Sequence, residues 1–478
     1  MTFYDFIKIG LQKNNRCPII PSERIFVPRT YVGKRRWNLY FYDAVIFKFH
    51  ALERTASLTD KSPSRDLSSR VALRGGGAPA DMVYQALEEV SPDPTGIRNK
   101  VVLVKPNAGF LAERIGTGLV TDSETVRGAI RFFRDAGAAK VLVGDGAIAG
   151  VDASEALKAA GIEAAARQEG GLPVNLDKGE PVHVAVKDPM AVDGVRLSSI
   201  ALEADLLVSV PVMKSHMNTV ASLGIKNLKG CLLRREKQRF HHLAEEERFQ
   251  RWHRWKTLER AIADLYSVLR PGIVVVDGVV AMEGMGPSMG DPKPLGLVLA
   301  SRNVLAAEMA ALYIMGIHWR EVPHVFLAAQ KAGVDLPEEI SALDVDLNAL
   351  KAFRSPFARA VPENIAAMFP CFKIMEGDAC SACCATVMAF LKQKGRRYED
   401  RKEGSLRIVL GKNIDPDLVD DATILLGNCT AGLRGRGRFL PGCPPVGSDI
   451  EREIGRMDEE GIGAPGTQKI IRRRGGSL

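Results

Sequence analysis

The chain has 478 residues, of which 46% are hydrophobic and 26% are charged, and its formal net charge at pH 7 is +8. This composition is typical of soluble globular proteins, and the length is sufficient for two to four domains of ordinary size. No apolar run approaches the ~18 residues of a membrane-spanning helix, and the N-terminus lacks the basic-then-apolar pattern of a secretion signal. We therefore expect a cytoplasmic protein with no membrane span.

The positive charge is concentrated at the two ends of the chain. Residues 1–69 hold 12 Lys and Arg against 6 Asp and Glu, and residues 469–478 hold four basic residues and no acidic one. The remainder is close to neutral, so the basic pI argues only weakly for a nucleic-acid partner. Residues 1–69 also hold 11 of the 30 aromatic residues without helix or strand periodicity. We interpret them as an atypical extension or a wrongly assigned start, and residues 466–478 as a flexible basic tail.

From Arg70 onward, short apolar runs alternate with helical segments. Thr121 and Glu124 have the spacing of a capping box, which predicts that Thr121 begins a helix that continues to about Asp135. Apolar runs separated by helices are typical of parallel strands that are covered on both faces. We predict an α/β domain over 70–350, with a parallel or mixed sheet and helices on both faces. The clearest predicted strands are 71–74, 101–104 and 141–143, and the clearest predicted helices are 81–90 and 153–160.

Polar residues follow several predicted strands at their carboxyl ends. Because the carboxyl ends of parallel strands meet at one edge of a sheet, these residues are expected to share a cleft. Each residue alone has a simpler interpretation, since Lys105 could pair with Asp145 and Asp277 could cap a turn. The strand-end residues are Lys105, Asn107, Asp145, Lys214, His216 and Asp277.

The segment 205–230 holds the densest group of cations and amides. Its apolar run ends at Pro211, and three lysines, two asparagines and one histidine follow before the segment ends. Lysines grouped around a histidine repel one another unless an anion is bound, so a small anionic substrate is expected. A solvated loop with ordinary surface lysines is the alternative. We predict catalysis by Lys214, His216 and Lys226, and substrate binding by Lys105, Asn107, Asp145, Asn227, His241 and Asp277.

Six motifs resemble those of the domain-of-unknown-function 362 family over roughly residues 70–320. They are VKPN (104–107), VTDSETVRGAI (120–130), VGDG (143–146), VPVMKSH (210–216), GIKNLKG (224–230) and DGVVAMEGMGP (277–287). Members of this family are often joined to iron–sulfur segments, and the fold is distantly similar to that of the lactate racemase family. The resemblance implies a fold but no reaction.

A charged insertion, 234–260, follows the GIKNLKG motif. It mixes both signs at spacings that allow i,i+4 pairs, which predicts a solvated helix. In the family that the motifs resemble, a histidine follows at a similar point, which implies that His241 belongs to a lid over the cleft. The neighbouring His242 is a weaker candidate.

Six of the eight cysteines lie after residue 370. Disulfides are disfavoured without secretion, so clustered thiols indicate a metal site. Cys380 and Cys383 have the two-residue spacing that suits one metal centre. Proline follows Cys443, as it follows cluster cysteines in ferredoxins. We predict a smaller α/β domain over 365–465 that carries a [4Fe–4S] cluster on Cys380, Cys383, Cys429 and Cys443.

Two alternatives to an iron–sulfur cluster stay open for these cysteines. Structural zinc takes four nitrogen or sulfur ligands as well, although its common form has two short-spaced pairs and this chain has one. Buried, inert cysteines are the second alternative. Within a metal site, Cys371 or Cys384 could replace one of the four ligands.

The predicted function is that of an iron–sulfur oxidoreductase, with a polar cleft for a small anion and an electron-transfer partner. One alternative is a non-catalytic, metal-dependent protein that passes electrons or a cofactor onward. Another is an isomerase or racemase that uses Lys and His as acid and base. A bound iron–sulfur cluster would distinguish the oxidoreductase from the isomerase or racemase.

Overall fold

The computed structural model describes residues 69–462, with the exception of 92, 113–115, 242, 244–245, 360–365, 380 and 443. The chain divides into two compact units, Met1–His50 and Ala51–Leu478, and all described residues lie in the second. The predicted basic tail and all but the last residue of the predicted N-terminal extension lie outside the described residues. No helix in the described part has the length and apolar character needed to cross a membrane.

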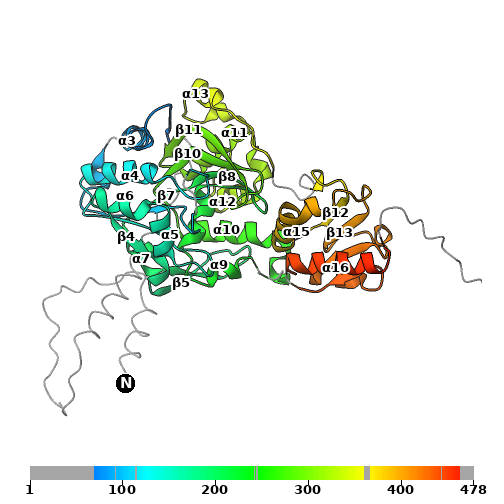
Figure 1. Cartoon of the computed structure of the whole chain (residues 1–478). Coiled ribbons are helices and arrows are strands. Elements are labelled where there is room, and N and C mark those ends of the chain that lie inside the picture. Colours follow the sequence, from blue (N-terminus) through cyan, green and yellow to red (C-terminus); the bar gives the residue numbers. More distant parts are fainter. Residues whose placement is uncertain are drawn as a thin grey trace, which may run out of the picture. The chain divides into compact units, whose positions relative to one another are not determined.

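Nine strands of the described residues form one mixed sheet (Figure 1). Seven of them run in the order β1-β11-β10-β7-β2-β3-β4, while β8 pairs with β10 and β9 pairs with β8. Strands β10, β7, β2, β3 and β4 are parallel, whereas β11 is antiparallel to both β1 and β10. The bounds are β1 Val71–Gly75, β2 Val101–Pro106, β3 Lys140–Asp145, β4 Leu172–Asn175, β7 Leu206–Val210, β8 Val212–His216, β9 Val220–Ser222, β10 Ile273–Glu283 and β11 Asp291–Ser301.

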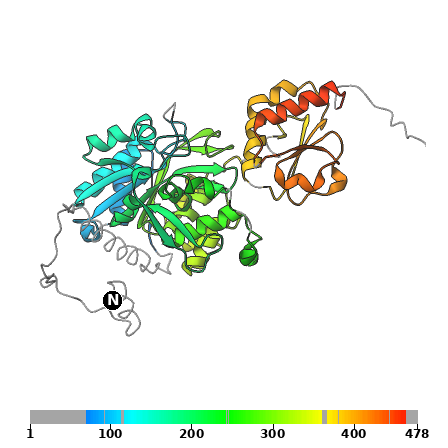
Figure 2. The same cartoon turned by 90° about the horizontal axis from the view of Figure 1, so that it is seen from below.

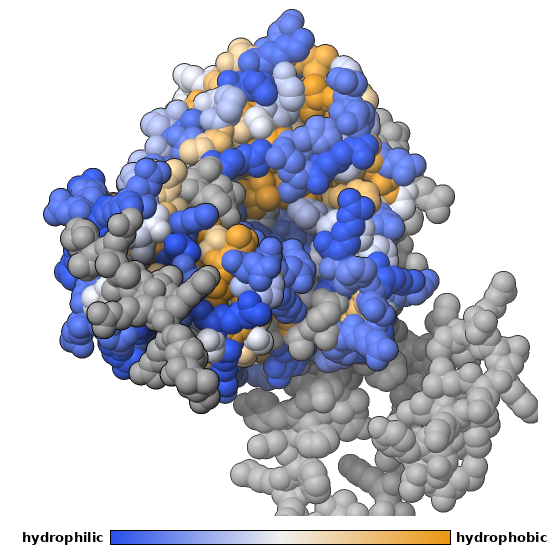
Figure 3. Space-filling model, turned by 90° about the vertical axis from the view of Figure 1, so that its right-hand side faces the viewer, coloured by the Kyte–Doolittle hydropathy of each residue, from blue (hydrophilic) through white to orange (hydrophobic). Residues whose placement is uncertain are grey.

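The sheet separates two hydrophobic cores. Val102 and Val104 belong to one core and Leu103, between them, belongs to the other, because successive side chains of a strand point to opposite faces. Apolar residues on both faces explain why these strands are continuous apolar runs. On the face drawn in Figure 3, hydrophilic residues predominate and the hydrophobic patches are separate.

Helices cover both faces of the sheet, as the sequence predicted (Figure 1). One core includes side chains of α3 (Pro79–Val90), α4 (Ser123–Asp135), α5 (Ala153–Ala159) and α6 (Ile162–Gln168). The other includes side chains of α8 (Gly224–Asn227), α10 (Thr257–Val268), α11 (Val304–Ile314) and α12 (Pro323–Ala332). The α/β class and the mixed sheet are therefore confirmed. Beside this sheet, β5 (Pro181–Ala185) and β6 (Gly194–Ser198) form a two-stranded antiparallel ribbon.

Helix α4 is capped by Asp122, and the prediction that Thr121 would cap it was wrong. The Asp122 carboxylate accepts a hydrogen bond from the Glu124 amide (2.8 Å). Thr121 Oγ1 instead donates to the Val210 carbonyl and accepts from the Asn107 amide, both at 2.8 Å. Its hydroxyl thus joins the ends of β2 and β7, a long-range role that local spacing does not reveal.

The insertion 234–260 is not one solvated helix, so that prediction was also wrong. Its described residues form α9 (Glu236–Arg239), a 3₁₀ segment (Glu247–Trp252) and the start of α10. Glu236 is 2% exposed because it pairs with Arg196, which lies forty residues earlier, as well as with Arg239. The charge of Glu236 is therefore buried beside two arginines, whereas the i,i+4 pattern predicted that it would be solvated.

Residues 366–462 contain a second, parallel sheet with its own core (Figures 1 and 2). Its order is β12-β13-β14-β15, with bounds Phe372–Gly377, Leu406–Gly411, Thr423–Leu426 and Arg438–Leu440. Helices α15 (Ser381–Lys394) and α16 (Gly447–Glu459) pack against each other and contribute Val387, Leu391, Ile450 and Ile454 to this core. The predicted smaller α/β segment is therefore present.

Candidate functional site

A cavity of about 510 Å³ lies at the carboxyl ends of β2 and β3, beside β8 and α8. This volume is in the range of small-molecule sites. Seven of the nine predicted catalytic and substrate-binding residues line it, while Lys105 and Asp277 do not. The seven are Asn107, Asp145, Lys214, His216, Lys226, Asn227 and His241.

Lys105 lies behind the cavity wall in a buried ion pair with Asp145. The distance from Lys105 Nζ to Asp145 Oδ1 is 2.7 Å, and the two side chains are 0% and 3% exposed. Lys105 Nζ also donates to Asn227 Oδ1 (3.1 Å) and to the Pro106 carbonyl (3.0 Å). The Lys105 amine is therefore fully engaged. Lys105 therefore does not line the cavity as predicted. It forms the ion pair with Asp145 that was the simpler interpretation.

Asn227 and Gly230 connect this ion pair to the segment that carries Lys226. Asn227 Nδ2 donates to Ser209 Oγ (3.0 Å) and to the Lys105 carbonyl (3.2 Å), which fixes the end of α8 against β2 and β7. A Cβ at position 230 would stand 2.7 Å from Lys105 Nζ, so glycine permits the close approach. The GIKNLKG motif thus supplies structural contacts as well as cations.

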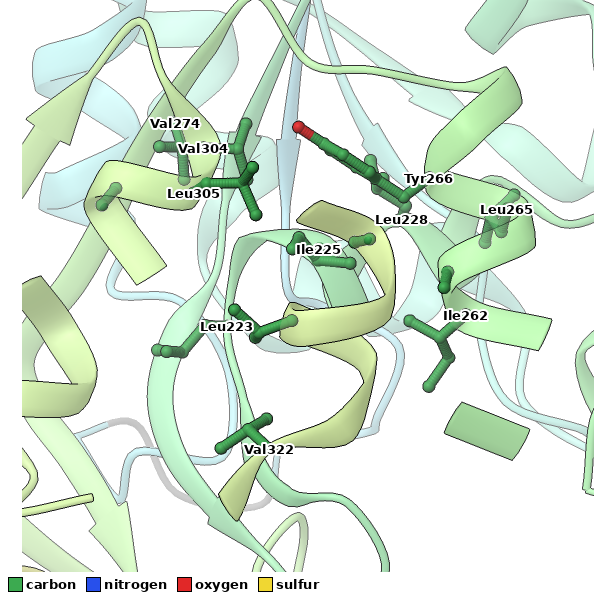
Figure 4. Packing of buried hydrophobic residues seen from close by; sticks show 14 of the residues in the cluster. Leu223, Ile225, Leu228, Ile262, Leu265, Tyr266, Val274, Val304, Leu305 and Val322 are labelled. Carbon is green, nitrogen blue, oxygen red and sulfur yellow. The ribbon is translucent and has the colours of Figure 1, made fainter. Parts of the chain in front are cut away.

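The start of α8 is held by a buried carboxylate. Glu308 Oε1, on α11, accepts a hydrogen bond from the Ile225 amide (2.8 Å). Burial raises the pKa of Glu308 to about 7. Figure 4 shows Ile225 and Leu228 among the packed apolar side chains of this core, which include Ile262. The backbone at position 226 is therefore held in place by the buried residues Ile225 and Leu228.

Lys214 extends from β8 and is 1% exposed. Its Nζ donates to Asn107 Oδ1 (2.7 Å), to the Leu119 carbonyl and, at 3.4 Å, to the Pro287 carbonyl. Burial lowers the pKa of Lys214 to about 7, and the positive charge of Lys226 acts in the same direction. Because all three neighbours are acceptors, the ammonium form is the one that satisfies them.

Lys226 lines the cavity without a hydrogen-bond or ion-pair partner among the described residues. Burial lowers the pKa of Lys226 to about 8, and the charge of Glu259 opposes this shift. At pH 7 about a tenth of its amine is therefore unprotonated, far more than for a lysine of ordinary pKa. This is the protonation state that a base or a nucleophile needs.

Lys229 and Lys237 also line the cavity, and neither was among the predicted site residues. Lys229 Nζ is 2.6 Å from His241 Nε2, and burial lowers the pKa of Lys229 well below its usual value. Lys237 Nζ pairs with Asp177 Oδ1 at 2.5 Å. Lys229 lies inside the GIKNLKG motif, which could have indicated it. Lys237 lies in the insertion, where nothing local marks it.

His216 is neutral, with its proton on Nε2. Its Nδ1 accepts a hydrogen bond from the Asn218 amide (3.0 Å), so this nitrogen carries no proton. Burial lowers the pKa of His216 well below its usual value, and the charges of Lys226 and Lys229 add to the shift. A neutral imidazole of this tautomer donates one hydrogen bond through Nε2.

Asp277 caps a turn behind the cavity. Its carboxylate accepts from the Asp122 amide (2.7 Å) and from the Val279 amide (3.0 Å). Burial raises the pKa of Asp277 to about 7, and its negative charge acts to raise the pKa of Lys214. Asp277 therefore influences the cavity through Lys214 and does not line it.

The four predicted metal ligands fall, in sequence, within the segment 366–462 that contains the second sheet, and two of them, Cys380 and Cys443, lie outside the described residues. Cys383 is buried and Cys429 is exposed. In sequence, positions 380, 429 and 443 closely follow β12, β14 and β15, which are parallel. Within the described part of the chain, no three His, Cys, Asp or Glu side chains are grouped to hold a metal ion.

Backbone contacts bring two of these strand ends together. The Asn428 amide donates to the Gly442 carbonyl (2.9 Å), and the Gly442 amide donates to Asn428 Oδ1 (3.0 Å). A Cβ at Gly427 would stand 2.8 Å from Cys383 Sγ. Cys371 precedes β12, whose six residues separate its two ends by roughly 17 Å. Cys371 is therefore at the opposite edge of the sheet and cannot replace a ligand there.

Residues 102–313 match the family described as Domain of unknown function (DUF362). This match confirms the resemblance that the six sequence motifs indicated. The chain is also 29% identical over 235 residues to the thylakoid-associated protein sll1697 of Synechocystis sp., a segment that covers 48% of this chain and 67% of that protein.

Two solved structures match part of this chain at low similarity. The lactate racemase apoprotein of Thermoanaerobacterium thermosaccharolyticum matches with a TM-score of 0.35 and 15% identity, over 53% of this chain and 58% of that one. A protein of Thermotoga maritima from a structural genomics programme matches with a TM-score of 0.28 and 14% identity, over 53% and 60%. The chain thus spans about three fifths of the length of either solved chain.

Proposed function

We propose that the cavity is the site of an acid–base enzyme that acts on a small anionic substrate. The observation that carries this proposal is an excess of positive charge. Lys214, Lys226 and Lys229 line one cavity, while the only carboxylate among its described lining residues, Asp145, is already paired with Lys105. A bound anion would compensate the remaining cations.

The residues divide into distinct roles. Lys226 is the proton acceptor, because its amine has no partner among the described residues and its pKa is about 8. His216 donates a hydrogen bond through Nε2 to an oxygen that gains negative charge during the reaction, as preorganised donors do in other enzymes. Lys214 and Lys229 orient the anion, because a bound negative charge favours their ammonium forms over the neutral amines that burial promotes in the empty cavity.

The proposal is tested by the thermal transition of the full chain with acetate, malonate, pyruvate or inorganic phosphate. Acetamide, which is similar in size to acetate and uncharged, is the control ligand. At least one anion should raise Tm, and His216→Ala and Lys226→Met should diminish that increase. Lys351→Met, at an exposed position, should leave it intact. Equal stabilisation by acetamide, or an unchanged response of Lys226→Met, would contradict the proposal.

A redox function is the second candidate, and the strand ends of the second sheet favour it. In sequence, positions 380, 429 and 443 each follow one of three parallel strands, and Cys383 lies on α15. Cysteines with this arrangement suit an iron–sulfur cluster, with zinc as the alternative. When bound, the cluster would transfer single electrons. The oxidoreductase activity, the electron-transfer partner and the cytoplasmic location stay predictions.

A further inference from the structure

Five lysines lie in or directly behind the cavity wall, and four of their amines have partners. Lys105 pairs with Asp145, and Lys237 pairs with Asp177. The Lys214 amine is surrounded by three acceptor oxygens, and that of Lys229 contacts His241. We propose that the fifth, Lys226, is a nucleophile that forms an imine with the carbonyl carbon of a small oxo acid. This inference rests on the proposed anion site and names its substrate class.

The backbone that carries Lys226 is rigid, as a nucleophile requires. Ile225 and Leu228 are 0% exposed and belong to the core that also contains α10 and α11. Glu308 holds the first turn of α8, and Asn227 holds its last residue against β2 and β7. The Lys226 side chain therefore projects from a fixed point into the cavity.

The surroundings increase the fraction of Lys226 that is a neutral amine, which is the reactive form. Burial lowers the pKa of Lys226 to about 8, and the lysine has no hydrogen-bond acceptor among the described residues that would hold it as an ammonium. Lys214 has a pKa of about 7, but its Nζ is held by three acceptor oxygens and is not free to attack a carbonyl carbon. Desolvated lysines of the first kind are those that form imines with carbonyl substrates in other enzymes.

The chemistry balances without an oxidant or a reductant. The Lys226 nitrogen lone pair forms the new C–N bond while the electron pair of the carbonyl group moves to its oxygen. Both hydrogens of the neutral amine then leave with that oxygen as one water molecule, which gives the C=N bond. The His216 Nε2–H can donate to the oxygen while it is negatively charged.

The second functional group of the substrate follows from the remaining charges. His216, Lys226 and Lys229 line the same cavity. A carboxylate that accompanies the carbonyl would be attracted by Lys229 and Lys214 while the carbonyl carbon reaches Lys226. A small 2-oxo acid, such as pyruvate, has both groups on adjacent carbons.

The experiment is reductive trapping on the full chain with pyruvate as the probe and sodium cyanoborohydride as the reductant. Intact mass measurement and peptide mapping then locate the stable secondary amine. We expect the adduct to form at Lys226 and to be absent in Lys226→Arg. An excess of malonate should lower the yield of the adduct, because malonate competes for the anion site. Lys226→Arg retains the positive charge, so its Tm response to malonate should persist, which shows that the variant is folded and binds anions.

The outcomes separate this inference from the proposed function. Absence of an adduct in the natural protein, together with an anion-induced increase of Tm, overturns the imine and leaves the anion site. Equal labelling of Lys226 and the exposed Lys351 also overturns the imine, because it shows nonspecific reaction. An adduct at Lys226 without any anion-induced increase of Tm supports the nucleophile and contradicts the anion site.

Discussion

Gly230 lies so close to Asp145 that a Cβ atom at position 230 would stand 1.9 Å from Asp145 Oδ1. Real Cβ atoms do not approach an oxygen to that distance, so Gly230→Ala must displace the carboxylate from Lys105. We expect a loss of about 1–3 kcal/mol in the free energy of unfolding, as for other overpacked sites. Urea unfolding measures it. Gly432→Ala is the matched control, since nothing lies within 4 Å of its added Cβ. A similar loss in both variants would refute the steric origin of the effect.

Asp145→Asn should be more damaging than a comparable change at the surface. The substitution leaves the Lys105 ammonium, which is fully buried, without its counter-charge, and such losses cost about 3–5 kcal/mol. Glu338→Gln removes an ion pair with Arg320 in which both side chains are about 60% exposed, and it should cost less than about 1 kcal/mol. The comparison uses denaturant unfolding at one pH. Equal losses of unfolding free energy in the two variants would show that the Lys105 ammonium is not shielded from solvent.

Lys226 should make the stability of the empty protein increase with pH above neutrality. The pKa of Lys226 in the folded state is about 8, below the ordinary value of 10.5, so the unfolded chain binds more protons in this window. Stability therefore rises between about pH 8 and 10.5, according to linkage. Lys226→Met removes this contribution, and its unfolding free energy should rise less steeply with pH than that of the natural protein. Parallel slopes would show that the Lys226 amine remains solvated.

The cysteine variants should differ in their effect on bound iron. Cys383 adjoins the strand ends that precede Cys429 and Cys443, whereas Cys371 lies at the other edge of the second sheet. After anaerobic purification, Cys383→Ser should lose most of its iron and acid-labile sulfide, and Cys371→Ser should retain both. If the natural protein contained zinc and no acid-labile sulfide, the cysteines would hold zinc and the predicted cluster would be wrong. Iron loss in Cys371→Ser alone would contradict the assigned edge.

Much of the architecture was accessible from the sequence because it depends on local patterns. Apolar runs predicted β2, β3 and β7, and the parallel arrangement placed Asn107, Asp145 and Lys214 at one edge. The roles of these residues depend on distances that no local pattern contains. Whether Lys105 faces a ligand or Asp145 is decided across forty residues of sequence, and the local pattern is compatible with both.

The errors have the same origin. Charges in the insertion looked solvated because the partner of Glu236, Arg196, comes from a distant ribbon. Thr121 looked like a helix cap because its bond to Val210 is formed by a neighbouring strand. Lys237 was missed because only the folded chain places it beside Gly146, where a Cβ would stand 2.4 Å from Lys237 Nζ.

The basic side chains of the cavity wall, among the described residues, are lysines and histidines, with no arginine. Arginine stays charged in proteins, whereas a buried lysine can give up its proton. An empty cavity can therefore lower its own charge, and an arriving anion can bring a proton with it. Loading would then be electroneutral, with no net charge carried into the protein interior. Occupancy of such a site would depend on the product of anion and proton concentrations, so the cavity would respond to acidification even at a constant level of its ligand.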